Sequence, residues 1–221
     1  MKILSMKNLD FKKVIDELKA GAVIAVATET VYGFSCDPSN QKAVEKIYKI
    51  KGMGFTKPLL LITDDLEVVK RYFKMNKIEK ALAEKYWPGA LNIILKLKTN
   101  SSAGVPEKCG LVIKDKQNLK FKREKNEAAV RISSDKFMRA LARECGGFIT
   151  STSANLFGEK ECLSGMAVYR QFKNRKYQPD IILDAGKLKT EKPSTIVKVE
   201  KNKIKVLRQG EVVVDCKIEA K

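Results

Sequence analysis

Residues 23–63 read VIAVATETVYGFSCDPSNQKAVEKIYKIKGMGFTKPLLLIT, and this stretch decides the fold class. Residues 23–27 are an apolar run that breaks at Thr28-Glu29-Thr30, a pattern typical of a buried strand entering a loop. Residues 39–52 predict a helix, because a polar cap begins it, apolar residues recur at helical spacing and glycine ends it. Residues 58–62 predict a second buried strand. Strand, helix and strand at this spacing indicate a βαβ unit of an α/β protein, with both loops facing one cleft.

The rest of the chain continues to mix helices and strands. Helical spacing predicts helices at 11–18, 66–73, 78–86 and 166–172, and apolar patterns predict strands at 91–97, 128–132, 148–150, 180–183, 195–199 and 204–207. With 221 residues and 44% hydrophobic content, the chain can bury the core of one compact domain. We expect that domain to cover residues 1–212, followed by a loose charged tail at 213–221.

The chain is strongly basic, with 44 lysines and arginines against 26 acidic residues and a net charge of +18 at pH 7. This balance suits anionic partners such as nucleotides or RNA. The alternative is a compositional lysine bias spread evenly over a solvated surface. For most of the lysines we favour the second interpretation.

The five cysteines, at positions 36, 109, 145, 162 and 216, form no C-x-x-C pair, and the chain contains no histidine. A zinc site is therefore not expected, and a triad that depends on histidine is excluded. Scattered cysteines are typical of a reducing compartment. The first residues are too polar for a signal peptide and no later stretch could span a bilayer, so we expect a cytoplasmic protein.

Two loops rich in hydroxyl groups follow apolar strands: Thr28–Thr30 and Ser151–Asn155. Ligands of open α/β sheets bind beyond the carboxyl ends of strands, so both loops are candidate walls of a site. Neither G-x-x-x-x-G-K-[ST] nor G-x-G-x-x-G occurs, so these fingerprints give nucleotide binding no support. The alternative is that both loops are only capping turns, and the residue pattern alone leaves the two interpretations equal.

Seven short stretches carry a family resemblance. They are ATETVYG (27–33), KIYKIKGMGFTKPLLL (46–61), YWPGALNIIL (86–95), AVRIS (129–133), TSTSANLFGE (150–159), PSTIVKV (193–199) and VLRQG (206–210). In this order they resemble the motifs of the YrdC/Sua5 (TsaC) family, over residues 10–212 without rearrangement. The resemblance implies a YrdC-like α/β fold: an open, twisted, mixed sheet with flanking helices and a basic concave cleft.

The resemblance also implies an activity. Family members are L-threonylcarbamoyladenylate synthases, nucleotidyltransferases that make threonylcarbamoyl-AMP and pyrophosphate from L-threonine, bicarbonate or CO₂, and ATP. The product serves t6A modification of A37 in tRNAs that read ANN codons. The partners implied are ATP, L-threonine, bicarbonate and the proteins that complete t6A, with direct tRNA binding left open. Mg²⁺ is expected with ATP, and zinc is not.

The motif matches assign roles to single residues. Thr30 and Tyr32 match positions that bind threonine, and Lys51 matches the catalytic first residue of K-x-R. The nucleotide-binding matches are Arg131, Ser153, Asn155, Ser194 and Arg208. Cations spread the triphosphate charge, while hydroxyl and amide groups fix its orientation. Substitution at phosphorus depends on positioning and charge neutralisation, so the absence of histidine is no objection.

Position 53 departs from the family pattern, because Met53 stands where K-x-R has its second cation. A thioether cannot neutralise phosphate or carbamate charge. We expect another cation to compensate, with Lys57 ahead of Lys49 and Arg139. The alternative is a catalytically altered paralogue that acts as a tRNA-, double-stranded-RNA- or nucleotide-binding module.

Residues 114–127, KDKQNLKFKREKNE, form an apparent insertion relative to the family pattern. A lysine-dense run with few apolar residues is typical of an exposed loop or hairpin. The alternative is a contact with the phosphate backbone of a nucleic acid.

A third interpretation is a carbamoyl-transfer domain like that of the hydrogenase-maturation proteins, which share this fold. Those proteins carry zinc-finger and acylphosphatase segments that have no match in this sequence. We therefore favour the synthase.

Overall fold

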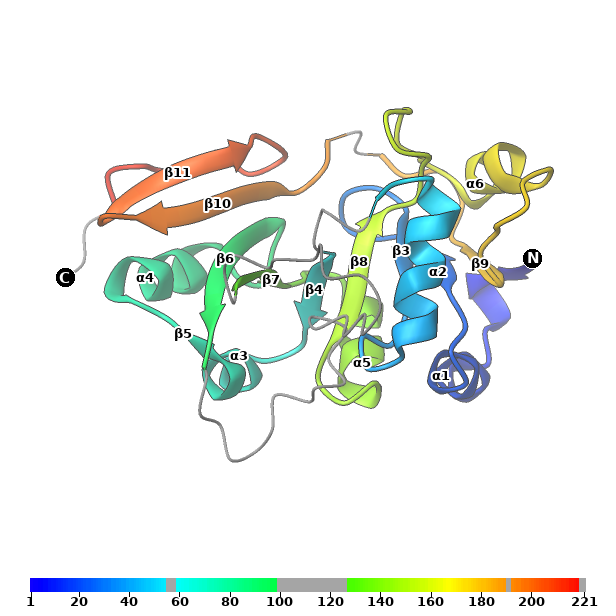
Figure 1. Ribbon diagram of the computed structural model, residues 1–221, viewed down its shortest axis with the longest axis horizontal. Coiled ribbons are helices and arrows are strands. Elements are labelled where there is room, and N and C mark those ends of the chain that lie inside the picture. The colour runs from blue at the N-terminus through cyan, green and yellow to red at the C-terminus, as the bar shows by residue number, and fades with distance from the viewer. Residues whose placement is uncertain (55–58, 99–126, 190–191, 219–221) are drawn as a thin grey trace.

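The computed structural model describes residues 1–54, 59–98, 127–189 and 192–218. Within these residues eleven strands pair into one open sheet in the order β1-β9-β2-β3-β8-β4-β7-β6-β10-β11, with β5 beside β6 (Figure 1). The strands are β1 (Lys2–Ser5), β2 (Ile24–Val26), β3 (Gly33–Ser35), β4 (Leu60–Thr63), β5 (Phe73–Lys74), β6 (Leu91–Leu97), β7 (Glu127–Ile132), β8 (Ile149–Ser153), β9 (Ile181–Asp184), β10 (Thr195–Glu200) and β11 (Lys203–Arg208). Parallel and antiparallel pairs alternate irregularly, so the expected open mixed sheet is confirmed.

Six α-helices in the described residues flank this sheet. They are α1 (Phe11–Lys19), α2 (Gln41–Lys51), α3 (Leu66–Tyr72), α4 (Lys77–Tyr86), α5 (Lys136–Glu144) and α6 (Gly165–Phe172), and a single 3-10 turn η1 (Met6–Asn8) precedes α1. Figure 1 shows α1, α2, α5 and α6 around one half of the sheet, and α3 and α4 with the β10–β11 hairpin around the other half.

The strands in the first half are apolar on both faces because helices cover both faces. In β2, Ala25 packs into one cluster with α2 and α6, whereas Ile24 and Val26 pack into another with α1 and α5. In β9, Ile182 and its neighbours Ile181 and Leu183 divide in the same way. The two-residue period of a strand therefore sorts one apolar run into two cores.

The stretch 23–63 folds differently from the expected βαβ unit. Residues Gly33–Ser35 form β3, which is antiparallel to β2, so the first two strands make a hairpin. Strand β8 then lies between β3 and β4 and is antiparallel to both, which leaves β3 and β4 parallel with α2 between them in sequence. A three-residue strand carries too little periodicity to be recognised, and no local pattern shows that a strand from residue 149 onward will insert.

Helix α2 has the caps that its sequence predicts. The side chain of Asn40 accepts a hydrogen bond from Ala43 N at 3.1 Å. Gly52 adopts the left-handed conformation with φ 63°, which suits glycine, and its amide bonds to the carbonyls of the last turn. These caps make Lys51 the last helical residue and set its direction toward β8.

The segment after β11 packs against α4 and does not form the loose tail that we expect from its sequence. Val214 is buried in the core of the second half. The amide of Asp215 donates to the Tyr86 hydroxyl at 2.9 Å, and Lys85 lies 3.3 Å from the Asp215 carboxylate. Apolar side chains between the charged ones therefore decide the course of this segment as far as residue 218.

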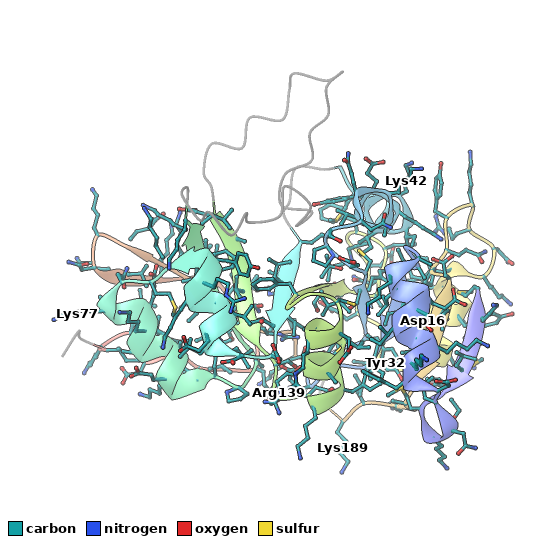
Figure 2. All side chains as sticks on the ribbon, turned by 90° about the horizontal axis from the view of Figure 1, so that it is seen from below. Asp16, Tyr32, Lys42, Lys77, Arg139 and Lys189 are labelled. Atoms are coloured by element: carbon teal, nitrogen blue, oxygen red, sulfur yellow. The ribbon has the colours of Figure 1, made fainter. Side chains whose placement is uncertain are left out.

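Many lysines lie on the outer surface. Figure 2 shows Lys42, Lys77 and Lys189 on three different sides of the molecule, which agrees with lysines spread over a solvated surface. The lysine-rich run at 114–127 lies outside the described residues except for Glu127, which begins β7.

In the part of the chain that the structure describes, no helix combines the length and apolarity that a bilayer crossing requires.

Candidate active site

A cavity of about 270 Å³ lies where the two halves of the sheet meet. Its walls come from the loop after β2, the end of α2, the end of β8, and the beginning of β10 with the end of β11. Because β2 and β8 are both antiparallel to β3, they run in the same direction and their carboxyl ends open at one edge. The lining includes seven residues that the motifs single out: Thr30, Lys51, Arg131, Ser153, Asn155, Ser194 and Arg208.

Tyr32 is not among the residues that line this cavity, and its expected contact with threonine stays a prediction. Its side chain is fully buried in the core beside α2 and α6. The hydroxyl accepts from Ala185 N at 2.9 Å, donates to Gly186 O at 2.9 Å and lies 3.2 Å from the Asp184 carboxylate. Burial raises the pKa of this hydroxyl. Tyr32 therefore ties the start of β3 to the segment after β9.

We call Thr28, Thr30, Lys51, Ser153 and Asn155 the loop wall. The Lys51 ammonium donates to the carbonyl oxygen of Ser153, and to the carbonyl and side-chain oxygens of Asn155 at 2.9 and 3.2 Å. An ammonium has three N–H donors, so all three have acceptors inside the protein. Burial lowers the pKa of Lys51 to about 8, while Glu161 and Cys162 act in the opposite direction. Lys51 thus holds the loop after β8 as well as facing the cavity.

The same loop is ordered by its own side chains. Ser153 Oγ donates to Asn155 Oδ1 at 2.6 Å, and Asn155 Nδ2 donates to the Glu159 carbonyl at 2.5 Å. The amide of Phe157 donates back to the Lys51 carbonyl at 2.9 Å. The S-x-N motif and the end of α2 therefore form one hydrogen-bonded unit.

The two threonines of the loop wall have different hydrogen-bonding capacity. The hydroxyl of Thr28 donates to Val31 O at 2.8 Å and accepts from Thr30 N at 3.1 Å. Because its only proton is used, Thr28 Oγ1 must accept in its 3.0 Å contact with Thr30 Oγ1. Thr30 therefore donates its proton to Thr28, and both lone pairs of Thr30 Oγ1, a residue that lines the cavity, are left as acceptors.

We call Arg131, Ser194 and Arg208 the arginine wall. The Arg131 side chain is 3% exposed, and its Nη1 lies 3.5 Å from Glu29 Oε1. Neither Nη1 nor Nε makes a hydrogen bond to any residue that the structure describes. Burial lowers the pKa of this guanidinium, which Glu29 and Asp135 partly offset. A buried cation with unmet donors is costly, and beside a cavity it fits an anionic ligand.

Arg208 completes this wall. Its Nε donates to the Ser194 carbonyl at 3.0 Å and its Nη2 to Ser194 Oγ at 3.1 Å. Burial lowers the pKa of Arg208; Glu161 opposes this effect, and the positive charge of Arg131 adds to it. Gly210 allows the geometry, because a Cβ there would lie 2.1 Å from the Pro193 carbonyl. The R-x-G motif therefore clamps the beginning of β10 and brings two like charges to one wall.

Met53 lies on the cavity wall and also packs against the core beside α2. Of the proposed compensating cations, Lys49 is exposed on α2, Arg139 lies on α5, and neither lines the cavity. Lys57 is outside the described residues, so its role stays a prediction. Within the described chain, the cations that line the cavity are Lys51, Arg131 and Arg208.

The sequence pattern missed two side chains that hold the arginine wall in place. Glu29 faces Arg131 and accepts from Ser133 Oγ at 2.7 Å. Asn92 in β6 donates to Ser194 Oγ at 2.7 Å and is fully buried. The signal for Asn92 is a lone amide in the apolar run Leu-Asn-Ile-Ile-Leu, because a buried polar residue needs a partner.

The solved structures that resemble this chain share its fold. P. abyssi Sua5 in complex with L-threonine matches with a TM-score of 0.75 and 23% identity, over 95% of this chain and 58% of the Sua5 chain. This chain thus spans little more than half of that Sua5. E. coli YciO matches with a TM-score of 0.76 and 22% identity, over 98% of this chain and 97% of YciO.

Sequence comparison identifies the family. A protein of Methanocaldococcus jannaschii that is provisionally named a threonylcarbamoyl-AMP synthase is 34% identical over 214 residues, 95% of this chain and 92% of that protein. Residues 16–210 match the model of the Sua5, YciO and YrdC proteins, which carries the description "Telomere recombination". The chain therefore belongs to the Sua5/YciO/YrdC family.

Proposed function

We propose that this protein is an L-threonylcarbamoyladenylate synthase. It joins L-threonine, bicarbonate or CO₂, and ATP, releases pyrophosphate, and supplies threonylcarbamoyl-AMP to the proteins that complete t6A at A37 of tRNA. The name of the 34% identical relative and the L-threonine bound by P. abyssi Sua5 support this choice of substrates. We place the reaction in the cytoplasm, because Cys36, Cys145 and Cys162 are free thiols, as in a reducing compartment.

The observation that carries the proposal is the arginine wall. Arg131 lines the cavity and keeps two buried donors, Nε and Nη1, without hydrogen-bond partners among the described residues, and its positive charge lowers the pKa of the neighbouring Arg208. Two guanidinium groups beside each other repel unless an anion lies between them. A polyphosphate supplies that negative charge and accepts from several N–H groups at once.

The hydroxyl groups give the cavity a direction. On the loop wall, Thr30 offers an acceptor, which suits an N–H or O–H group of the amino acid. On the arginine wall, Ser194 Oγ already accepts two hydrogen bonds, so its proton is left for an anionic oxygen. We therefore place threonine toward the loop wall and the phosphates toward the arginine wall.

The reaction needs positioning and charge more than acid–base groups. The amine of threonine forms a bond to the carbon of CO₂, loses a proton to solvent and becomes a carbamate. A carbamate oxygen then attacks the α-phosphorus of ATP, the bond from that phosphorus to the β-bridging oxygen breaks, and pyrophosphate leaves. Arg131 and Arg208 are placed to neutralise the charge that develops on the leaving group.

Mg²⁺ would accompany the nucleotide. No group of three or more His, Cys, Asp or Glu side chains in the described residues could hold a metal alone. Of the cavity oxygens, Asn155 Oδ1 already accepts from Ser153 and Lys51, whereas Ser153 Oγ keeps lone pairs and would be one ligand of an ion that takes phosphates and waters as its main ligands. Bound there, the ion would withdraw charge from the phosphates.

Pyrophosphate release tests the proposal directly. With ATP, Mg²⁺ and bicarbonate, L-threonine should stimulate release well above the rates measured with L-serine or without an amino acid. A reaction without the protein and a reaction in which ATP is the only substrate serve as blanks. Equal release in all three amino-acid conditions would rule out the synthase.

Met53 favours a second candidate, an altered paralogue that binds nucleotide or RNA without this chemistry. Its side chain lies on the cavity wall, where the family pattern has a cation. The two candidates differ in one result. The paralogue would bind ATP or tRNA in an equilibrium assay and release no pyrophosphate in response to threonine.

A further inference from the structure

Asn92 is a buried amide, and the residues next to it in the sequence, Leu91 and Ile93, are both apolar. It lies in β6, which pairs with both β7 and β10 and is therefore a central strand. Asn92 is 0% exposed, and its Oδ1 has no hydrogen-bond partner among the described residues. A buried amide oxygen without a hydrogen-bond partner is unfavourable, so we expect a compensating role for the hydrogen bonds of the amide nitrogen.

The orientation of this amide is fixed by its neighbours on β10. Its nitrogen lies 2.7 Å from Ser194 Oγ and 3.2 Å from the Thr195 carbonyl. A carbonyl oxygen can only accept, so the atom beside it must be the NH₂ group. The contact to Ser194 is therefore one in which Asn92 donates.

Ser194 Oγ receives a second obligate donor on its other side, Arg208 Nη2 at 3.1 Å. A hydroxyl oxygen has two lone pairs, and both are then engaged. The hydroxyl proton cannot point at either neighbour, because an amide NH₂ and a guanidinium accept nothing. Since Ser194 lines the cavity, the proton is free to meet a ligand there.

We propose that Asn92 is a positioning residue that makes the Ser194 hydroxyl a dedicated hydrogen-bond donor to a phosphate oxygen. The inference rests on the proposed nucleotide binding, and it does not depend on the threonylcarbamoyl chemistry. It concerns the arginine wall alone. L-Threonine, placed at the loop wall, should be insensitive to Asn92.

Inorganic pyrophosphate is the probe, and its dissociation constant is measured by titration calorimetry at fixed pH and salt. Ser194→Ala should weaken binding about tenfold, the order of a lost hydrogen bond to a charged group. Asn92→Ala should weaken it by about three- to tenfold, since the hydroxyl remains but can rotate away. The double variant should bind no more weakly than Ser194→Ala, because Asn92 acts through that hydroxyl.

Asn92→Asp is the matched chemical test. Its carboxylate would accept the Ser194 proton and pair with Arg208, so pyrophosphate should bind more weakly than to Asn92→Ala. Circular dichroism and melting curves verify the fold of each variant, and Asn92→Leu replaces any variant that fails to fold. Affinity for L-threonine provides the specificity control and should change less than about twofold, because sites that share no partner respond independently.

Three results would overturn the inference. The first is that the unmodified protein does not bind pyrophosphate. The second is that Asn92→Ala weakens pyrophosphate binding as much in the Ser194→Ala background as in the unmodified protein. The third is that Asn92→Ala weakens L-threonine binding as much as pyrophosphate binding. If the single and double variants bind pyrophosphate as expected but the protein releases no pyrophosphate in response to threonine, only the synthase proposal is rejected.

Discussion

The two walls of the cavity each carry a buried cation, and only one of these cations is satisfied by the protein. The ammonium of Lys51 has three acceptors on the loop after β8. The guanidinium of Arg131 leaves Nε and Nη1 without acceptors in the described chain. Burial lowers the pKa of both groups, so desolvation does not separate them. Their difference lies in partners, and it indicates that a ligand's negative charge belongs at the arginine wall.

The contrast follows from where each residue stands. Lys51 is the last residue of a capped helix, and its ammonium group donates to backbone carbonyls that belong to the fold. Arg131 comes from β7 and faces Glu29 at 3.5 Å, too far for a full hydrogen-bonded pair. A charge used by the fold contributes to stability, whereas a charge left for a ligand costs stability until the ligand arrives.

The largest expected effect is on the arginine wall. Arg131→Met should lower threonine-dependent pyrophosphate release by about a hundredfold, comparable to the loss of a donor to transition-state charge. When Arg131→Met is combined with Glu29→Gln, which removes the partner carboxylate as well, the melting temperature should stay equal or rise, because no buried charge is left without its partner. Arg139→Met, on α5 and away from the cavity, is the control for both measurements. A fall in melting temperature with full activity would show that Arg131 serves the fold.

The loop wall should respond in the opposite way. Lys51→Met should lower the free energy of unfolding by about 1–3 kcal/mol, because the carbonyls of the loop lose their donor. Threonine-dependent pyrophosphate release should fall at least about tenfold, because the loop after β8 would no longer be held in position beside the cavity. Denaturant unfolding and pyrophosphate release measure the two effects. Lys49→Met removes an exposed lysine from the same helix and should change neither by much.

Met53→Arg tests whether the cavity lacks a cation. We expect Lys57 to supply the missing charge, so the substitution should crowd an already filled position and leave threonine-dependent activity equal or lower. The measurement is the rate of pyrophosphate release against ATP concentration. Lys57→Met should then be the damaging change, whereas a gain of about tenfold from Met53→Arg, with tighter ATP binding, would show that the cavity lacks a cation.

The smallest effect is on the titration of Lys51. Its pKa of about 8 lies below its ordinary value of 10.5, so between these pH values the folded chain binds fewer protons than the unfolded chain. The stability that Lys51 contributes relative to Lys51→Met should therefore rise with pH across this window. The Lys51 side-chain carbon signal, assigned by its absence from Lys51→Met, should titrate near pH 8 in NMR spectra. A midpoint near the ordinary value would contradict the burial of its charge.

Some of the site could be predicted from the sequence because its signals are local. Thr30 and Ser153 stand where hydroxyl-rich loops follow apolar strands, and strand direction then brings these loops to one edge. Arg131 and Arg208 could be placed only through the family motifs, because a lone arginine on a strand has no periodic signature. The burial of Tyr32 could not be predicted, since a motif gives the order of residues and not the side to which each side chain turns.

Asn92 and the insertion of β8 could not be predicted for a related reason. Asn92 gains its meaning from Ser194, more than a hundred positions along the chain, and a strand register must form before the two meet. Strand β8 lies between β3 and β4 only because their edges present unpaired backbone groups to it. Long-range pairing of this kind leaves no trace in local periodicity.

The sequence by itself determined the alternation of helices and strands, the positive charge, the caps of α2 and the family to which the chain belongs. Each of these depends on residue type and short spacing. Only the tertiary structure decided which cation is satisfied. Lys51 and Asn155 are 104 positions apart, and hydrogen bonding between them requires atoms within about 3 Å at a suitable angle. Such distances are set by packing, so the division between a cation that holds the fold and a cation that awaits a ligand exists only in three dimensions.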